Sequence, residues 1–289
     1  MKVAIIGGSG KMGRWFADFL LKDGKDVVIS GRNQEKLNEA GKRLGVKTAS
    51  NAEAVKEADI ILLSVSIESF EEVAIEISPH INAEQTVIDI TSIKESPMAT
   101  MHKYLKTERI LGTHPLFGPG ARGISNQNFV LTPTNEMERG LAGKVQEYLE
   151  GKGARVTLMT PQEHDAMMTI ILGLAHFIAI VSADTLLTAD KLRQTEKIGG
   201  ITYKVLLTLI ESVLSEDPEL YASLQMHLPE VNELEKLFQK KATEWTNLVE
   251  AKDREKFVQR MKELKSGLEK DAPDFGKAYQ NMYRIAEEL

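Results

Sequence analysis

A histidine held by a rigid turn is the residue best suited to acid–base chemistry in this chain. His114 follows a short apolar run, Ile110-Leu111, and precedes Pro115. Pro115 fixes its own φ and disfavours helix at His114, and Gly118-Pro119-Gly120 prevents a helix from restarting. We therefore expect His114 at a strand end, facing a cleft. Taken alone, it is more simply a histidine in a structured loop.

A glycine-rich loop near the N-terminus has the spacing of a dinucleotide site. The run Gly8-Ser9-Gly10-Lys11-Met12-Gly13 reads G-x-G-x-x-G between an apolar strand at 2–7 and a helical pattern at 14–21. In that context the glycines let backbone N–H groups approach a pyrophosphate at the positive end of the helix. The alternative is a flexible glycine turn. We assign cofactor contacts to Gly8, Ser9, Gly10, Lys11, Met12 and Gly13.

The end of the second expected strand, 26–30, favours NADP over NAD. Ser30-Gly31-Arg32 stands where an NAD-binding chain would place an acidic residue against the ribose hydroxyls. A serine hydroxyl and a guanidinium would hold a 2′-phosphate, so we assign Ser30 and Arg32 to it. The alternative is that Arg32 begins the next helix in solvent. We also assign Ser64 and Val65, at the end of strand 59–65, to the cofactor site.

Strands that alternate with helices predict the fold class. The strand at 86–90 ends in Thr91-Ser92-Ile93-Lys94, and open α/β sheets bind ligands at such carboxyl ends. Further strands are expected at 128–132 and 154–158. We expect an α/β chain: a Rossmann-type, doubly wound parallel sheet in residues 1–160, followed by an all-α domain in residues 161–289.

The all-α half begins with a long apolar helix at 161–187. At about 100° per residue, Asp165, Thr169, Leu172 and His176 would share one face. Taken alone, His176 is more simply a core histidine. A second apolar helix is expected at 203–214. The amphipathic remainder, 232–289, carries charges that are best explained as a solvated face.

Composition excludes several function classes. The chain has 289 residues, no cysteine and a net charge of −6. The absence of cysteine rules out disulfides and thiolate metal sites, and we assign no metal ligand. The acidic balance argues against a nucleic-acid surface. The apolar stretch 170–181 is shorter than the ~20 residues of a membrane span. We expect a soluble, cytoplasmic protein that binds neither nucleic acid nor membrane.

These motifs together resemble the prephenate dehydrogenase family of tyrosine biosynthesis. The similarity rests on the residues that occur in the same order and spacing: the glycine loop 7–14, Asp89-Ile90-Thr91-Ser92-Ile93-Lys94, His114-Pro115-Leu116-Phe117-Gly118-Pro119, Glu163-His164-Asp165, Ala175-His176-Phe177 and Asp217-Pro218-Glu219-Leu220-Tyr221. It covers about residues 1–225.

The resemblance implies oxidative decarboxylation of prephenate to 4-hydroxyphenylpyruvate, with hydride transfer to a nicotinamide. His114 would accept the proton of the substrate hydroxyl, a role that suits a neutral imidazole with a pKa of about 6.5. Ser92 would lie beside the nicotinamide and orient His114. His176 would reach the substrate from the helical domain, which is expected to form a homodimer.

One position departs from the family pattern. Ser212 stands where the family has an arginine that holds a substrate carboxylate. The cations that could replace it are Arg122, Lys94, Arg193 and Lys204. Arogenate therefore stays open as the substrate, as does NAD as the cofactor. Another dehydrogenase of the same build, such as a β-hydroxyacid or deazaflavin-dependent NADP reductase, and a non-catalytic NADP-binding sensor are the remaining alternatives.

Overall fold

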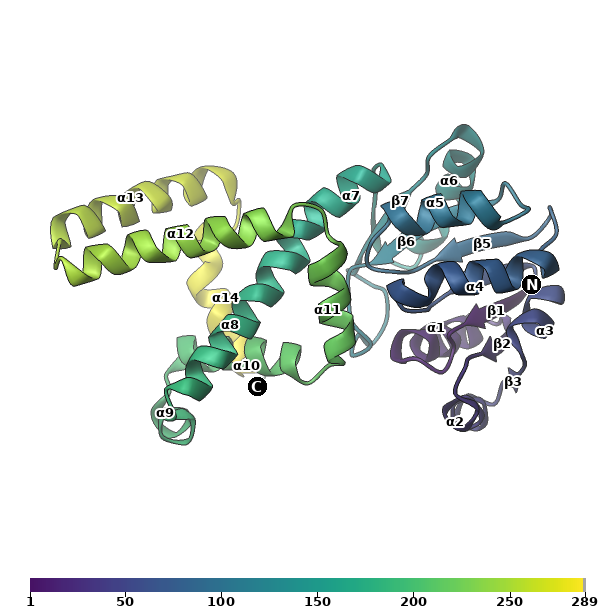
Figure 1. Ribbon diagram of the computed structural model, residues 1–289, viewed down its shortest axis with the longest axis horizontal. Coiled ribbons are helices and arrows are strands. Elements are labelled where there is room, and N and C mark those ends of the chain that lie inside the picture. The colour runs from purple at the N-terminus through teal and green to yellow at the C-terminus, as the bar shows by residue number, and fades with distance from the viewer. Residues whose placement is uncertain (288–289) are drawn as a thin grey trace. The chain divides into compact units, whose positions relative to one another are not determined.

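The computed structural model describes residues 1–287 and divides into two compact units, Met1–Met168 and Thr169–Leu289. The expected 161–289 domain and the 232–289 amphipathic segment both end in two residues that lie outside the described part. The first unit holds every strand of the sheet and the second is helical (Figure 1). Helix α7 (Pro161–Met168) lies within the first unit, so the units divide one short helix later than the expected boundary.

An eight-stranded sheet of order β3-β2-β1-β4-β5-β6-β7-β8 forms the centre of the first unit. Its strands are β1 (Lys2–Ile6), β2 (Asp26–Ser30), β3 (Lys47–Thr48), β4 (Ile60–Leu63), β5 (Thr86–Asp89), β6 (Ile110–Pro115), β7 (Asn128–Thr132) and β8 (Arg155–Leu158). β1 pairs with β2 on one side and with β4 on the other. After β1 the chain therefore builds the sheet first toward one edge and then, from β4, toward the other. Open α/β sheets bind ligands at the point where this direction reverses.

One pair of neighbouring strands in the sheet is antiparallel. β7 runs antiparallel to β6, with His114 opposite Val130. The segment between them, 116–127, contains no helix, and a parallel return requires a crossover that is usually helical. The sheet is thus mostly parallel, which confirms the predicted fold class, and the antiparallel pair is a feature that the sequence did not indicate.

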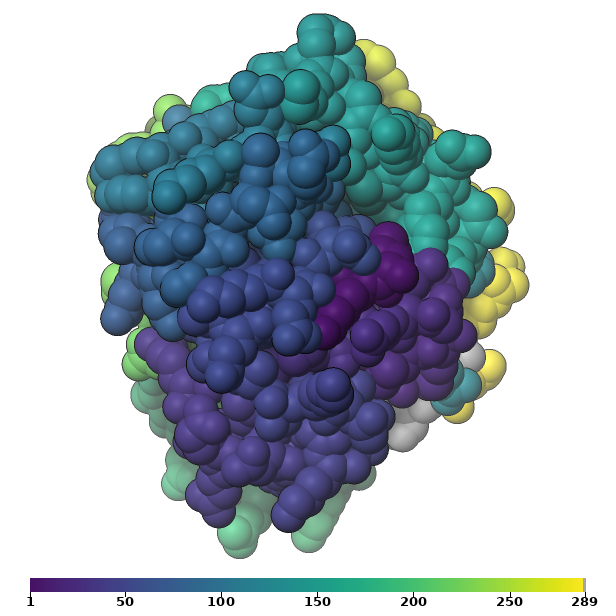
Figure 2. Space-filling model, turned by 90° about the vertical axis from the view of Figure 1, so that its right-hand side faces the viewer, coloured from purple at the N-terminus to yellow at the C-terminus, as the bar shows by residue number. Residues whose placement is uncertain are grey.

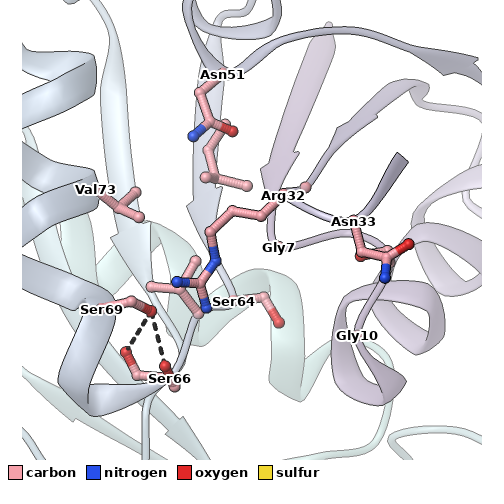
Figure 3. A pocket seen from close by; sticks show the side chains of 13 residues that line it. Gly7, Gly10, Arg32, Asn33, Asn51, Ser64, Ser66, Ser69 and Val73 are labelled. Atoms are coloured by element: carbon pink, nitrogen blue, oxygen red, sulfur yellow. Dashed lines mark hydrogen bonds between the residues drawn. The ribbon is translucent and has the colours of Figure 1, made fainter. Parts of the chain in front are cut away.

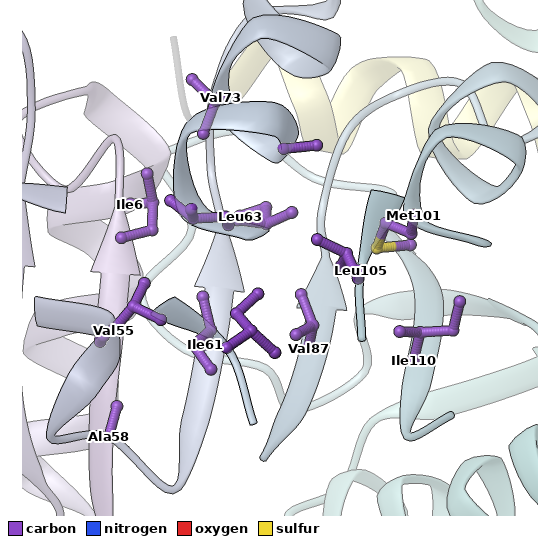
Figure 4. Packing of buried hydrophobic residues seen from close by; sticks show 14 of the residues in the cluster. Ile6, Val55, Ala58, Ile61, Leu63, Val73, Val87, Met101, Leu105 and Ile110 are labelled. Atoms are coloured by element: carbon purple, nitrogen blue, oxygen red, sulfur yellow. The ribbon is translucent and has the colours of Figure 1, made fainter. Parts of the chain in front are cut away.

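Helices cover both faces of the sheet because alternate strand residues point to opposite sides. The helices are α1 (Lys11–Lys22), α2 (Gln34–Leu44), α3 (Asn51–Lys56), α4 (Phe70–Ile77), α5 (Glu95–Tyr104), α6 (Glu136–Glu150) and α7. Ile6, Ile61 and Val87 pack with α3, α4 and α5 on one face (Figure 4). Val3 and Ile5 pack with α1, α2 and α6 on the other. Figure 2 shows the edge where β1 begins, with the N-terminal residues in dark purple at the surface.

The second unit is helical throughout its regular elements. They are a π-helix (Thr169–Leu174), α8 (Ala175–Thr188), α9 (Leu192–Ile198), α10 (Ile201–Leu214), α11 (Pro218–His227), α12 (Val231–Glu250), α13 (Arg254–Asp271) and α14 (Ala278–Glu287). The π-helix changes the number of residues per turn. The expectation that Asp165, Thr169, Leu172 and His176 share one α-helical face was therefore wrong, because the periodicity it relied on is interrupted.

The helical stretch Pro161–Thr188 has the length and apolar composition of a membrane-crossing helix. The expectation that no stretch is long enough was wrong, because the helix extends beyond the apolar run on both sides. Within its most apolar 18-residue window, 28% is buried inside the chain. Core helices of soluble proteins have the same length and composition, so this stretch is weak grounds for a membrane span.

Candidate active site

His114 lies near the carboxyl end of β6, a strand in which every residue is buried. β6 runs between β5 and β7, which hold it on both sides. The loop after it is fastened to α1, because Phe117 packs against Trp15 with ring centroids 4.9 Å apart and the Trp15 indole N–H donates to the Ala121 carbonyl at 2.7 Å. α1 follows the glycine loop directly, so the histidine turn and the glycine loop share this anchor.

The imidazole of His114 is part of a buried chain of hydrogen bonds. Its Nδ1 lies 2.8 Å from Nε2 of His164, and Nδ1 of His164 lies 2.6 Å from Oδ1 of Asp165. His164 and Asp165 are neighbours in α7 and are both buried. This chain of three side chains connects the strand end to a helix that is distant in sequence.

Asp165 is itself held by the N-terminus of α5. Its Oδ1 accepts from the backbone N–H of Lys94 at 2.7 Å, and its Oδ2 accepts from that of Glu95 at 2.9 Å. A carboxylate there satisfies two N–H groups that the helix leaves unpaired and lies at the positive end of the helix dipole. Asp165 therefore stays in one orientation.

A second buried network supports the same strand ends. The Lys94 ammonium pairs with Asp89 and donates to the Thr113 carbonyl at 2.7 Å. Asp89 also accepts from the Thr91 N–H at 2.7 Å, and the Thr113 hydroxyl donates to the Asp89 carbonyl at 2.7 Å. Burial raises the pKa of Asp89 and lowers that of Lys94, while their mutual attraction opposes both shifts. The network fixes the residue before His114.

Burial keeps both histidines of the hydrogen-bonded chain neutral. It holds the pKa of His114 well below 6.5, and the electrostatic interactions with His164 and Lys94 act in the same direction. Burial also lowers the pKa of His164, although Asp165 opposes this shift. His114 is 5% exposed. An imidazole that remains uncharged at neutral pH is ready to accept a proton.

Two sequence-based assignments in this region need correction. Ser92 follows β5 and is half-buried, but it makes no hydrogen bond with any described residue, so the hydrogen-bond partner of His114 is His164 and not Ser92. Lys94 is fully buried and paired with Asp89, so it is not available to hold a substrate carboxylate. Both residues lie after β5, as expected, but Ser92 does not hydrogen-bond His114 and Lys94 is not a free cation.

A cavity of about 250 Å³ lies where β1, β2 and β4 end (Figure 3). Gly7, Ser9 and Gly10 of the glycine loop line it. The remaining lining residues are Ile6, Gly31, Arg32, Asn33, Asn51, Ser64, Val65, Ser66, Ser69 and Val73. Gly7 has φ +85°, and a Cβ on it would lie 2.1 Å from the Ser64 carbonyl oxygen. The chain thus approaches itself so closely that a side chain there is excluded.

Arg32 extends into this cavity (Figure 3). Its guanidinium makes no ion pair or hydrogen bond with any residue among 1–287. Ser30, by contrast, is fully buried, and its hydroxyl donates to Asn51 at 2.8 Å. The assignment of Ser30 to a 2′-phosphate was therefore wrong, because Asn51 at the start of α3 occupies its hydroxyl.

The other assigned glycine-loop residues do not line the cavity, and two of them have a packing role. A Cβ on Gly8 would lie 2.6 Å from Cβ of Ile29, and one on Gly13 would lie 2.4 Å from the Gly7 carbonyl oxygen. These glycines let α1 pack closely on β1 and β2. Lys11 and Met12 begin α1.

His176 belongs to the second unit, in the first turn of α8. Its ring contacts Tyr221 of α11, with centroids 4.7 Å apart, and its Nδ1 is buried without a hydrogen-bond partner among the described residues. Burial lowers its pKa. The buried nitrogen therefore retains free hydrogen-bonding capacity.

Ser212 and the three replacement cations other than Lys94 are exposed. The Ser212 hydroxyl donates to the Leu209 carbonyl of its own helix, α10, at 2.8 Å. Arg122 lies in the loop after His114, and Arg193 and Lys204 lie in the second unit. None of these three cations makes an ion pair within residues 1–287. Each could therefore meet a carboxylate.

Sequence reasoning missed the roles of Asp89, Thr113, His164 and Asp165. The motif Glu163-His164-Asp165 contributed to the family resemblance, but no function was assigned to it. An adjacent histidine and aspartate at a helix start was a usable signal, since a buried carboxylate usually orients an imidazole. Their target, His114, lies 50 residues away in sequence.

Two family models match the chain in order along its sequence. The family model described as prephenate dehydrogenase, nucleotide-binding domain, matches residues 16–158. The one described as prephenate dehydrogenase, dimerization domain, matches residues 160–263.

Individual relatives are similar over most of the chain. A probable arogenate/prephenate dehydrogenase of Methanocaldococcus jannaschii is 36% identical over 268 residues, which are 91% of this chain and 60% of the relative. The T-protein of Haemophilus influenzae is 25% identical over 100% of this chain and 72% of its own length. The chain thus spans only about 60% of the length of the first relative.

A solved structure shows the same fold. Prephenate dehydrogenase from Aquifex aeolicus, in complex with hydroxyphenyl propionate and NAD+, superposes with a TM-score of 0.78 at 23% identity. The match covers 93% of this chain and 98% of that one. With both family models matched in order along the sequence, the chain belongs to the prephenate dehydrogenase family.

Proposed function

We propose that the protein oxidatively decarboxylates prephenate to 4-hydroxyphenylpyruvate, with NADP as the preferred hydride acceptor. The observation that carries this proposal is the neutral, buried His114, oriented by His164 and anchored beside the glycine loop. Arogenate, in which an amino group replaces the keto group of the side chain, is the alternative substrate. Both substrates carry the ring hydroxyl on which the proposed chemistry depends.

The residues of the first unit perform the proton chemistry in this proposal. Nε2 of His114 accepts the hydroxyl proton as hydride leaves the same ring carbon. Bound NADP or NAD would supply the hydride acceptor. Loss of CO₂ and aromatisation of the ring provide the driving force, so the protein mainly orients the reactants and stabilises developing charge. Ser92, at the end of β5, would face the nicotinamide.

Support for NADP comes from the free guanidinium of Arg32 in the cavity at the end of β2. The residues lining that cavity fit a dinucleotide, because the glycine loop presents backbone there without side chains. None of the described residues that line the cavity is acidic, so none of them would repel a 2′-phosphate. Ser64 and Val65 would contact the same cofactor from the end of β4.

We further propose a homodimer formed through the second unit, in the cytoplasm. Support comes from the matched dimerization-domain model and from large apolar side chains exposed on α8 and α10: Ile180, Val181, Leu187, Leu206, Leu209 and Leu214. Exposed apolar surface of this kind is usually covered in the functional state. A second copy would also explain why Pro161–Thr188 is so apolar.

A direct assay tests the activity. Purified protein is given prephenate or arogenate, each with NAD and with NADP, and reduced cofactor and aromatic product are measured. We expect turnover with prephenate and NADP; no turnover in any of the four combinations would refute the proposal. His114→Asn should lower kcat by about 10²–10⁴-fold while NADP still binds. Near-normal turnover of that variant would show that another group is the base.

A non-catalytic NADP-binding sensor is the second candidate, favoured by Ser212 in place of the family arginine. Calorimetric titration separates the two functions. A sensor binds NADP but neither binds nor converts prephenate, whereas the dehydrogenase binds both.

A further inference from the structure

We propose that His164 and Asp165 are positioning residues that fix the tautomer of His114, so that Nδ1 carries its proton and Nε2 is the proton acceptor. This inference rests on the proposed function for its kinetic consequence, but the tautomer itself is a property of the resting protein. The two can therefore be tested separately.

The assignment of protons starts at Asp165. An ionised carboxylate only accepts hydrogen bonds, so Nδ1 of His164, 2.6 Å from Oδ1, must be the donor. The backbone N–H groups of Lys94 and Glu95 also donate to this carboxylate, so both of its oxygens are acceptors. Asp165 therefore sets the tautomer of His164.

The tautomer of His164 then determines that of His114. A neutral imidazole with a proton on Nδ1 has a lone pair on Nε2, which can only accept. The neighbouring atom, 2.8 Å away, is Nδ1 of His114, which must be the donor. Burial favours the neutral form of both rings, so a doubly protonated histidine does not interrupt the chain.

Nε2 of His114 is left as the basic nitrogen. It makes no hydrogen bond with any residue among 1–287. If His164 were absent, the ring could place its proton on either nitrogen, and a proton on Nε2 would block the base. When His114 takes up a proton at Nε2, both nitrogens become donors and the Nδ1 bond to His164 is kept. Asp165 then stabilises the positive charge through His164.

Nitrogen-15 NMR of histidine-labelled protein tests the tautomer without any turnover. The His114 signals are identified by their loss in His114→Asn. We expect Nδ1 of His114 to be protonated and Nε2 to be bare at pH 7. A proton on Nε2 in the unaltered protein would overturn the inference, whether or not the protein proves to be a dehydrogenase.

Matched variants test the kinetic consequence. His164→Gln keeps an acceptor for Nδ1 of His114, whereas His164→Leu removes it. Gln162→Leu introduces the same side chain at an exposed position of α7 and is the control. We expect His164→Leu to lower kcat by about 10²-fold or more, with the KM for NADP unchanged and His164→Gln restoring part of the rate.

Outcomes of these variants are distinguishable. Equal rates for His164→Leu and Gln162→Leu would overturn the positioning role. If the leucine variant fails to fold, Asp165→Asn replaces it, because an amide can donate to His164 and thereby permit the wrong tautomer. An Asp165→Asn protein with normal kcat and an unchanged His114 spectrum would overturn the inference. Absence of turnover in the unaltered protein would refute only the proposed function.

Discussion

Trp15 donates its indole N–H to the carbonyl oxygen of Ala121 at 2.7 Å and so ties the loop after His114 to the first turn of α1. The glycine loop leads directly into that turn. One hydrogen bond thus relates the loop of the proposed proton acceptor to the proposed cofactor site, although its two residues are 106 positions apart in sequence.

Removing this donor should loosen the loop without destroying the aromatic cluster. Trp15→Phe keeps a ring against Phe117 but leaves the Ala121 carbonyl unpaired, which typically costs about 1 kcal/mol in the free energy of unfolding. We also expect a several-fold loss of kcat/KM. Phe19→Leu, which removes the ring stacked on the other side of Trp15, is the control. Equal loss of kcat/KM in both variants would contradict a specific role for the hydrogen bond.

The Lys94–Asp89 pair should be costly to break from one side. Lys94→Met leaves the Asp89 carboxylate buried without its cation, and losses of this kind are about 3–5 kcal/mol. Adding Asp89→Asn removes the uncompensated charge, so the double variant should be more stable than Lys94→Met alone. Urea denaturation followed by circular dichroism measures both. A double variant that is less stable than the single one would argue against a buried ion pair.

Stability should fall as the pH drops below about 6.5, the ordinary pKa of histidine. Burial lowers the folded-state pKa of His114, His164 and His176. The unfolded chain then binds protons that the folded chain does not, and each such histidine costs up to about 1.4 kcal/mol per pH unit. The effect is absent above this range, where both states are neutral.

Unfolding free energies measured from pH 7.5 to 5 test this dependence. His164→Gln should reduce the slope, since it removes one of the three groups. Stability that is flat across this window would show that the histidines can be protonated in the folded state.

Arg32 should control the choice between the two cofactors. Arg32→Ala removes a charge-assisted contact, so we expect NADP to bind about 10–100-fold more weakly while NAD binding is unchanged. Arg32→Asp should reverse the preference, because a carboxylate binds the ribose hydroxyls and repels a phosphate. Calorimetry gives both affinities. An NADP affinity that Arg32→Ala leaves intact would place the 2′-phosphate elsewhere.

Arg122 is the replacement cation that lies in the same loop as the histidine turn. Arg122→Ala should raise the KM for prephenate about tenfold or more while the KM for NADP stays constant. Arg193→Ala and Lys204→Ala provide matched losses of one positive charge in the second unit. If one of these raises the KM for prephenate instead, the carboxylate is held from the helical unit.

The fold class and the family were predictable from local signals. Apolar runs such as 59–65 and the glycine loop report a strand or a turn through neighbouring residues, and both lie as predicted. The antiparallel β7 was not predictable, because the direction of a strand depends on whether its connection crosses the sheet. The π-helix was missed for a similar reason, since its sequence reads as a continuous apolar helix.

The sequence by itself determined which residues could do chemistry: a histidine before proline, a glycine loop after a strand, and an arginine where an acid would select NAD. These are properties of residue type and spacing along the chain. Only the tertiary structure decided which of them meet. The Ser30 hydroxyl donates to Asn51, and Lys94 forms an ion pair with Asp89. The side chain that hydrogen-bonds His114 is His164 and not Ser92. Side chains 50 or more residues apart meet through strand order and helix packing, which no local pattern encodes.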